Sequence, residues 1–223
     1  MCGRYGFIAS GFKTWGLQDE LPGFKDNYNA TPGSFLPVLK TDSPLHAELM
    51  KWGLVPHWSK TATVKFSTIN ARAETVQTNP AFKDSFFHRR CLVPCLGFYE
   101  WRKNADGTKT PFFIHLTNQP FFAMAGIWDY WTDVEGKQFK SYAIITTAAN
   151  SLMKPIHSRM PVILAKADEA AWVEPLTPGH QAFALLKPFD STQMDVYQIS
   201  SQVNNPRNNS KSLLQPTSNR LAP

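Results

Sequence analysis

The hydrophobic positions fall into short runs separated by turn residues, a pattern typical of a protein built mainly of β-strands. From position 91 onward we predict strands at 91–102, 110–116, 121–131 and 141–147. The first two flank Asn104-Ala-Asp-Gly-Thr108, where Asp-Gly tolerates the positive φ of a tight hairpin turn. These four segments are therefore expected to form an antiparallel meander.

The remaining segments predict short helices and further strands around this meander. Additional strands are predicted at 35–40, 49–58, 160–165 and 196–199, the second of them running into a loop. The side chains suit helix starts at Ser10, Asn79-Pro80 and Asp168-Glu169, for helices reaching Leu17, His88 and Trp172. No repeat or linker divides the chain. We expect a single domain over 1–223, of the α+β class with mainly antiparallel β, and a disordered tail from about 217.

The composition is that of a folded protein with a basic surface. Of the 223 residues, 43% are hydrophobic and 18% are charged, and the formal net charge of +6 gives a pI near 9.2. Such a charge favours a polyanionic partner, because Lys and Arg near phosphates release counterions. No apolar run approaches the roughly 18 residues of a membrane span, and no secretion signal is recognisable. We therefore expect no membrane association and a cytoplasmic location.

The number and spacing of the cysteines bear on disulfide formation and on metal binding. Three cysteines, at positions 2, 91 and 95, cannot all pair within one chain, and free thiols fit a reducing compartment. Cys91 and Cys95 are spaced almost as zinc ligands are, but no second pair of matching kind follows. We therefore expect no metal and no cofactor.

Cys2 is the position with the most distinctive chemistry. If Met1 is removed, as the small side chain at position 2 permits, Cys2 carries an α-amine and a thiol on adjacent carbons. The α-amine, with a reference pKa of about 7.7–8.0, is partly unprotonated near neutrality. With an aldehyde, the amine can form an imine and the thiol can then close a thiazolidine ring. Since Met1 alone precedes Cys2, ordinary methionine removal is expected to suffice; the plain alternative is a Cys that stands second by chance.

An amide and a guanidinium are expected side by side in the segment 68–75. If this segment is extended, period-two alternation places Asn70 and Arg72 on one face, where they can hold a sugar oxygen and a phosphate. A polar strand edge would give the same pattern. Both interpretations remain open on local sequence.

Two titratable residues are candidates for proton transfer. Glu100 stands among aromatic residues, and apolar surroundings would raise its carboxyl pKa toward the range useful for catalysis, unless Glu100 is half-exposed and paired with Arg102. His157 lies in a polar loop bounded by prolines, where catalytic groups often concentrate. Arg159 follows two residues later and could point toward a phosphate, and Thr146 just ahead supplies a small hydroxyl.

Aromatic and basic residues alternate around Trp58. Bases that stack on aromatic rings contribute roughly 1–3 kcal/mol each without sequence preference, which is typical of proteins that bind single strands. For any single Trp, a place in the core is the favoured alternative. The interleaved residues are Lys51, Trp52, Trp58, Lys60, Lys65, Arg89 and Arg90.

Taken together, eight motifs in this order closely resemble the SOS-response-associated peptidase (SRAP) family over nearly the whole chain. They are Met1-Cys2-Gly3-Arg4, Asn29-Ala-Thr-Pro-Gly33, Trp52-Gly-Leu-Val-Pro56, Ile69-Asn-Ala-Arg-Ala-Glu-Thr75, Arg90-Cys-Leu-Val-Pro94, Gly97-Phe-Tyr-Glu-Trp101, His157-Ser-Arg-Met-Pro161 and Val203-Asn204-Asn205. The resemblance implies a barrel-like β core surrounded by short helices. It also implies crosslinking to abasic sites in single-stranded DNA, whose open sugar presents the aldehyde that Cys2 needs.

The same resemblance implies roles for individual residues. Asn70 would orient the Cys2 amine or ring, and Glu100 and His157 would shuttle protons, with His157 also assisting a competing β-elimination. The implied DNA contacts are Arg4, Arg72 and Arg159 to phosphates and Trp58 to a base, with Asn29 and Thr146 nearby. The protein would act as a monomer associated with DNA, in the nucleoid if it is bacterial.

Two other functions fit the same residues. In a thiol peptidase, Cys2 would attack a peptide carbonyl with His157 as base and Asn70 or Glu100 as the orienting group. A binding module without catalysis would use only the aromatic residues and the basic face.

Overall fold

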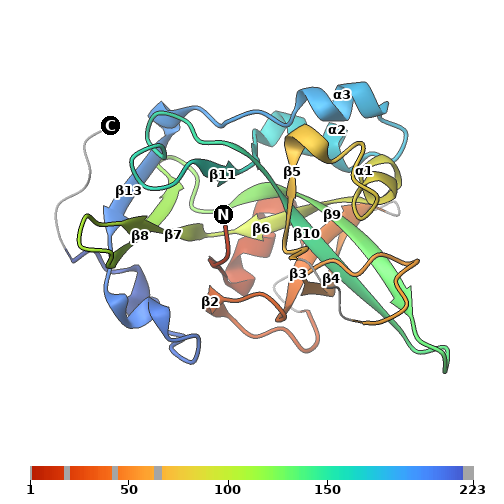
Figure 1. Ribbon diagram of the computed structural model, residues 1–223, viewed down its shortest axis with the longest axis horizontal. Coiled ribbons are helices and arrows are strands. Elements are labelled where there is room, and N and C mark those ends of the chain that lie inside the picture. The colour runs from red at the N-terminus through yellow and green to blue at the C-terminus, as the bar shows by residue number, and fades with distance from the viewer. Residues whose placement is uncertain (1, 18–20, 42–44, 63–66, 218–223) are drawn as a thin grey trace.

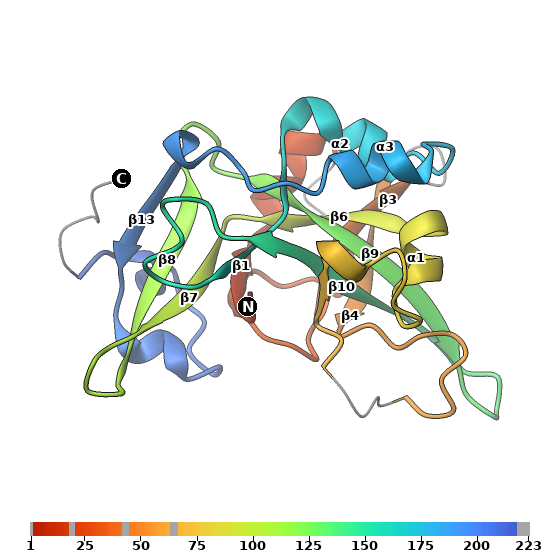
Figure 2. The same ribbon diagram turned by 45° about the horizontal axis from the view of Figure 1, so that its top comes forward.

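The computed structural model describes residues 2–17, 21–41, 45–62 and 67–217. Met1 and the expected disordered tail, apart from Thr217, lie outside the described residues. Figures 1 and 2 show the strands in two groups, with the three α-helices gathered beside one of them. No helix among the described residues is both long and apolar enough to cross a membrane.

Five strands close into a barrel. The ring runs β10, β4, β3, β6 and β9 and returns to β10, because β9 pairs with both β6 and β10. The expected barrel-like β core of an α+β protein is thereby confirmed. The strands span Phe35–Thr41 (β3), Leu45–Trp52 (β4), Arg90–Cys95 (β6), Phe122–Thr132 (β9) and Gln138–Ala148 (β10).

Shorter strands extend the barrel at its margins. β5 (Asn70–Arg72) pairs in parallel with β10, and β11 (Arg159–Pro161) pairs with the end of β10 in antiparallel orientation. β12 (Ile163–Leu164) pairs with β9, so the single strand expected at 160–165 is divided between two partners.

A second sheet of the described residues has the order β13, β8, β7, β1, β2. In Figure 2, β1 lies near the middle of the molecule, between the two groups of strands. The strands span Tyr5–Phe7 (β1), Asn27–Ala30 (β2), Gly97–Lys103 (β7), Lys109–Leu116 (β8) and Met194–Gln198 (β13).

The predicted meander is partly correct: its strands exist, and the antiparallel pairs β7–β8 and β9–β10 are confirmed, but β8 does not pair with β9. The segment 91–102 is two strands in different sheets, separated at Leu96, whose N–H donates to the Gly6 carbonyl over 2.7 Å. β8 pairs with β7 and β13 instead of β9, because both edges of β9 are taken by strands of the barrel sheet. The hairpin at 104–108 is confirmed, with Gly107 at φ 84°.

The helices are short, and their expected starts were only partly correct. The first is a 3-10 helix without a side-chain cap, and the expected helix at 80–88 begins later, after a turn in which the Asn79 side chain accepts from the Ala81 N–H over 3.0 Å. The helix expected after Asp168 is confirmed. The α-helices span Lys83–His88 (α1), Glu169–Val173 (α2) and Gly179–Ala184 (α3). The 3-10 helices of the described residues span Ala9–Trp15 (η1), Ala73–Thr75 (η2), Lys166–Asp168 (η3), Ser191–Gln193 (η4), Ser201–Asn204 (η5) and Lys211–Leu214 (η6).

Close packing at Gly97 gives a first prediction. A Cβ there would meet the Phe113 ring and would lie 2.8 Å from the Ile114 carbonyl oxygen, so Gly97→Ala should lower the free energy of unfolding by about 1–3 kcal/mol. Gly6 pairs directly with Gly97, but a Cβ there meets nothing nearer than 3.5 Å. Gly6→Ala is the matched control, and urea unfolding of both variants checks the prediction. Equal stability of the two variants would contradict it.

Candidate functional site

The pairing of β5 with β10 brings Asn70 to Cys2. In this parallel pair Asn70 lies opposite Ile144, and its buried side chain reaches the start of the chain. The Nδ2 atom of Asn70 donates to the Cys2 carbonyl over 2.9 Å. The Oδ1 atom of Asn70 is buried and has no hydrogen-bond partner among the described residues. An acceptor is therefore left facing the region around Cys2.

Glu100 and His157 line one cavity of about 400 Å³ together with Trp101, Lys109 and Asn204. Glu100 comes from β7, and His157 comes from the loop between β10 and β11. The Nδ1 atom of His157 accepts from the Arg159 N–H over 3.1 Å, so a neutral imidazole carries its proton on Nε2. The two titratable groups singled out from sequence thus share a cavity.

Burial determines the protonation of the site. It raises the pKa of Glu100 above its ordinary value, and the nearby His157 opposes the shift without cancelling it. Burial also raises the pKa of the Cys2 thiol, and the negative charge of Glu100 raises it further. At neutral pH, therefore, Cys2 is a thiol, and Glu100 retains a proton to a higher pH than an exposed glutamate does.

Arg4 and Asn29 connect the start of the chain to the segment after β13. Arg4 Nη1 donates to the Asn29 side-chain oxygen over 2.7 Å and to the Val203 carbonyl over 2.8 Å. Asn29 Nδ2 donates to the carbonyls of Asn205 and Asn208 over 3.1 and 2.8 Å. These bonds place the 203–208 segment beside the cavity, and the phosphate contact expected of Arg4 and the DNA contact expected of Asn29 stay predictions.

Arg72, Thr146 and Arg159 meet at one place on the barrel edge. Arg72 lies opposite Thr146 in the pairing of β5 with β10, and its side chain is exposed. Arg159 Nη2 donates to the Thr146 carbonyl over 2.6 Å. Arg159 also forms an ion pair with Glu74, which was not singled out from sequence.

Trp58 lies on a loop that is anchored on both sides. The Trp58 side chain is 53% exposed. Before it, the Val55 N–H donates to Ser141 Oγ over 2.8 Å; after it, the Ser59 carbonyl accepts from Trp131 Nε1 over 2.7 Å. The exposed ring is therefore carried on an anchored loop, and its stacking on a base stays a prediction.

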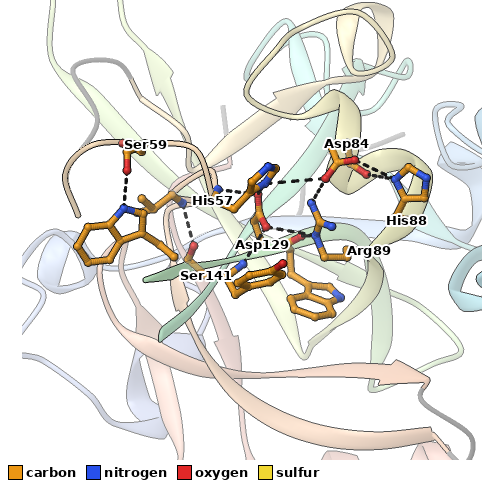
Figure 3. A network of polar contacts seen from close by, with 11 residues as sticks. His57, Ser59, Asp84, His88, Arg89, Asp129 and Ser141 are labelled. Atoms are coloured by element: carbon orange, nitrogen blue, oxygen red, sulfur yellow. Dashed lines mark hydrogen bonds and ion pairs between the residues drawn. The ribbon is translucent and has the colours of Figure 1, made fainter. Parts of the chain in front are cut away.

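A buried carboxylate holds the middle of this loop, as Figure 3 shows. Asp129 Oδ2 accepts from both the N–H and Nδ1 of His57, each over 3.0 Å. Arg89 Nε lies 3.2 Å from Asp129 Oδ1, and Arg89 also pairs with Asp84, which bonds His88. His57 is thereby a structural anchor for the Trp58 loop.

Trp101, Lys109, Asn204 and Glu74 were not identified as site residues from sequence. Trp101 and Asn204 belong to two of the motifs, and their contact, Trp101 Nε1 to Asn204 Oδ1 over 2.8 Å, joins segments far apart in the chain. A separate cavity of about 450 Å³ lies by η1 and α2 and contains none of the predicted site residues. No group of three His, Cys, Asp or Glu side chains within the described ranges could hold a metal ion.

Comparisons with known proteins agree with this architecture. The family model "SOS response associated peptidase (SRAP)" matches residues 1–206. The chain is 38% identical to the Abasic site processing protein YoaM of Bacillus subtilis, covering 96% of this chain and 97% of that one. It is 32% identical to the Abasic site processing protein HMCES of Rattus norvegicus, over 88% of this chain and 68% of the relative.

A solved structure from Bacteroides thetaiotaomicron superposes with a TM-score of 0.85 at 30% identity, covering 97% of this chain and 100% of that one. The motifs, the closed barrel and these similarities coincide over the same residues. The chain belongs to the SOS response associated peptidase (SRAP) family.

Proposed function

We propose that this protein processes abasic sites in single-stranded DNA by forming a covalent thiazolidine between Cys2, freed of Met1, and the C1′ of the open sugar. The observation that carries the proposal is the bond from Asn70 Nδ2 to the Cys2 carbonyl, which fixes the nucleophile against a rigid strand. The relatives named abasic site processing proteins support the substrate class. The protein would act as a monomer, associated with DNA in the cytoplasm.

The reaction needs several proton transfers. The Cys2 amine adds to the aldehyde, and a proton moves from nitrogen to oxygen to give a hydroxyl. This hydroxyl takes up a further proton and leaves as water, and the nitrogen then releases a proton to give an imine. The thiol then adds to the imine carbon, its proton moves to nitrogen, and the ring closes. We assign these proton transfers to Glu100 and His157, because both line the same cavity.

The buried Oδ1 atom of Asn70 and the raised pKa of Glu100 support this order of steps. A free Cys2 amine is a donor, and the buried Oδ1 of Asn70 is an acceptor without a partner among the described residues. The raised pKa of Glu100 favours the protonated carboxyl that water departure requires. On the imine, transfer of a C2′ proton of the sugar to His157 and departure of the 3′ phosphate would give the competing β-elimination.

The thiol's protonation argues against a peptidase as the main activity. Acyl transfer by a cysteine requires the thiolate, which a neighbouring cation usually stabilises. Here burial and the Glu100 charge raise the thiol pKa instead. The amine of a terminal cysteine attacks first in the proposed chemistry, so a low thiol pKa is not needed for the initial step.

Cys2→Ala should abolish crosslinking. Purified protein without Met1 is incubated with a single-stranded oligonucleotide that contains one abasic site and is then run on a denaturing gel. Wild type should give a shifted band that survives heating, and Cys2→Ala should give none. Cys95→Ala, which removes another buried thiol, is the matched control and should crosslink. An equal band from Cys2→Ala would refute the proposal.

Glu100→Gln and His157→Ala should slow crosslink formation or reversal by about 10²–10⁴-fold, the usual contribution of acid–base catalysis. Binding to undamaged single strands should persist in both variants. Single-turnover gel kinetics measure the rates, and fluorescence anisotropy measures the binding. Unchanged rates in both variants would remove the two residues from the mechanism.

Glu100→Gln should at the same time stabilise the protein. Because burial raises the pKa of Glu100 above 4.5, ionisation favours the unfolded chain as pH rises from about 4.5 through the folded-state pKa. Gln lacks this penalty, so the thermal midpoint of the variant should exceed that of wild type near neutrality and match it at low pH. A midpoint below that of wild type at pH 7 would contradict this account.

Arg72→Ala should weaken binding to single strands with and without a lesion by the same factor. Arg72 is exposed and lies opposite Thr146, and we expect its guanidinium to meet a phosphate and not the reacting sugar. Loss of one phosphate contact should reduce the slope of log affinity against log salt by about 0.7. A loss confined to lesion-containing DNA would assign Arg72 a different role.

A further inference from the structure

Arg159, expected to bind a phosphate, is already bound to a carboxylate. Its Nη1 and Nη2 atoms donate to the two oxygens of Glu74, each over 2.9 Å. The Nη2 atom also donates to the Thr146 carbonyl over 2.6 Å, while Nε and Nη2 each lie 3.4 Å from Thr146 Oγ1. The paired Nη1 and Nη2 donors of the guanidinium are therefore occupied by Glu74. Nη2 also contacts strand β10 of the barrel through Thr146.

The pairing of β5 and β11 with β10 brings three charged residues to the same edge of the barrel. Arg72 lies opposite Thr146, Arg159 lies opposite Ala148, and Glu74 follows Arg72 by two residues in η2. One carboxylate thus stands with two guanidinium groups on the edge that also carries Asn70. The hydrogen bond from Arg159 is the main reason that the pKa of Glu74 is lowered, and Arg72 acts in the same direction.

The two side chains of this ion pair differ in how exposed and how firmly anchored they are. The Arg159 side chain is only 17% exposed and is fixed to Thr146, whereas the Glu74 side chain is 53% exposed. Arg binds carboxylates and phosphates through the same fork of parallel N–H donors. If an external anion replaced either partner, Glu74 would be the group to leave.

We propose that Glu74 fills the phosphate site of Arg159 in the DNA-free protein, and that a backbone phosphate of a bound single strand displaces it. This inference rests on the proposed function, because that function supplies the strand. The exchange breaks one ion pair for each one formed, so Glu74 weakens the binding of every strand. A strand joined covalently to Cys2 is retained despite this competition, whereas an undamaged strand is released more readily.

Glu74→Gln should therefore bind undamaged single strands more tightly than wild type. The test is anisotropy of a labelled, lesion-free oligonucleotide at fixed salt, and we expect roughly a three- to tenfold lower Kd. Glu48→Gln is the matched control. Glu48 is also ion-paired, to Lys140 at 2.7 Å and Lys40 at 3.5 Å, and its replacement changes the net charge equally. Glu48→Gln should shift the Kd by less than about twofold.

If the inference is right, the tighter binding of Glu74→Gln depends on Arg159. In an Arg159→Ala background, Glu74→Gln should change the Kd by no more than Glu48→Gln does. Three results would overturn the inference: equal affinity of the Glu74 and Glu48 variants, weaker binding by Glu74→Gln, which would mean that Glu74 holds Arg159 for DNA, or a gain that survives without Arg159.

Crosslinking of an abasic oligonucleotide by wild type is scored separately. If it fails, the proposed function fails, while the comparison on undamaged strands still decides the role of Glu74. If crosslinking succeeds and the Glu74 variant binds as wild type does, only the present inference fails.

Discussion

Strand β10 is the element on which both the barrel and the site depend. It closes the ring by pairing antiparallel with β9 and in parallel with β4, and further along it pairs in parallel with β5. The same register sets Asn70 opposite Ile144 and Arg72 opposite Thr146. A slip of one residue would turn Asn70 to the other face of its strand and remove its bond to the Cys2 carbonyl. The strand that closes the barrel therefore also places Asn70 against Cys2, the proposed nucleophile.

Two buried carboxyl groups, those of Asp129 and Glu100, lie in different electrostatic surroundings. Asp129 receives His57 on one oxygen and Arg89 on the other, so its burial is matched by donors and it fixes the Trp58 loop. Glu100 lies beside His157, yet burial outweighs the histidine and the pKa of the carboxyl stays raised. A carboxyl group whose pKa is raised by burial is a better proton donor near neutrality. The first arrangement anchors a loop, and the second is suited to the proton transfer that we propose.

The sequence predicts many of the strands but not all of their partners. Alternation and turn residues located the hairpin at 104–108 and the strand at 35–40, because these signals are local. The division of 91–102 at Leu96 was missed, since it depends on which sheet each half joins. Motif order pointed to Glu100 and His157, which the structure places in one cavity. Glu74 was missed because only the register of β5 against β10 brings it to Arg159.

The proposed chemistry requires that a residue near the end of the chain be held in place. Chain ends are usually mobile, and ordering each residue costs about 1–2 kcal/mol of backbone entropy. Here β1 begins three residues after Cys2 and pairs on both sides, with β2 and with β7. Arg4 bonds Asn29 and the Val203 carbonyl, so the last third of the chain also holds Arg4 in place. The proposed nucleophile, Cys2, can then be positioned as firmly as a residue within a strand, because the contacts that order it belong to the barrel and its neighbouring sheet.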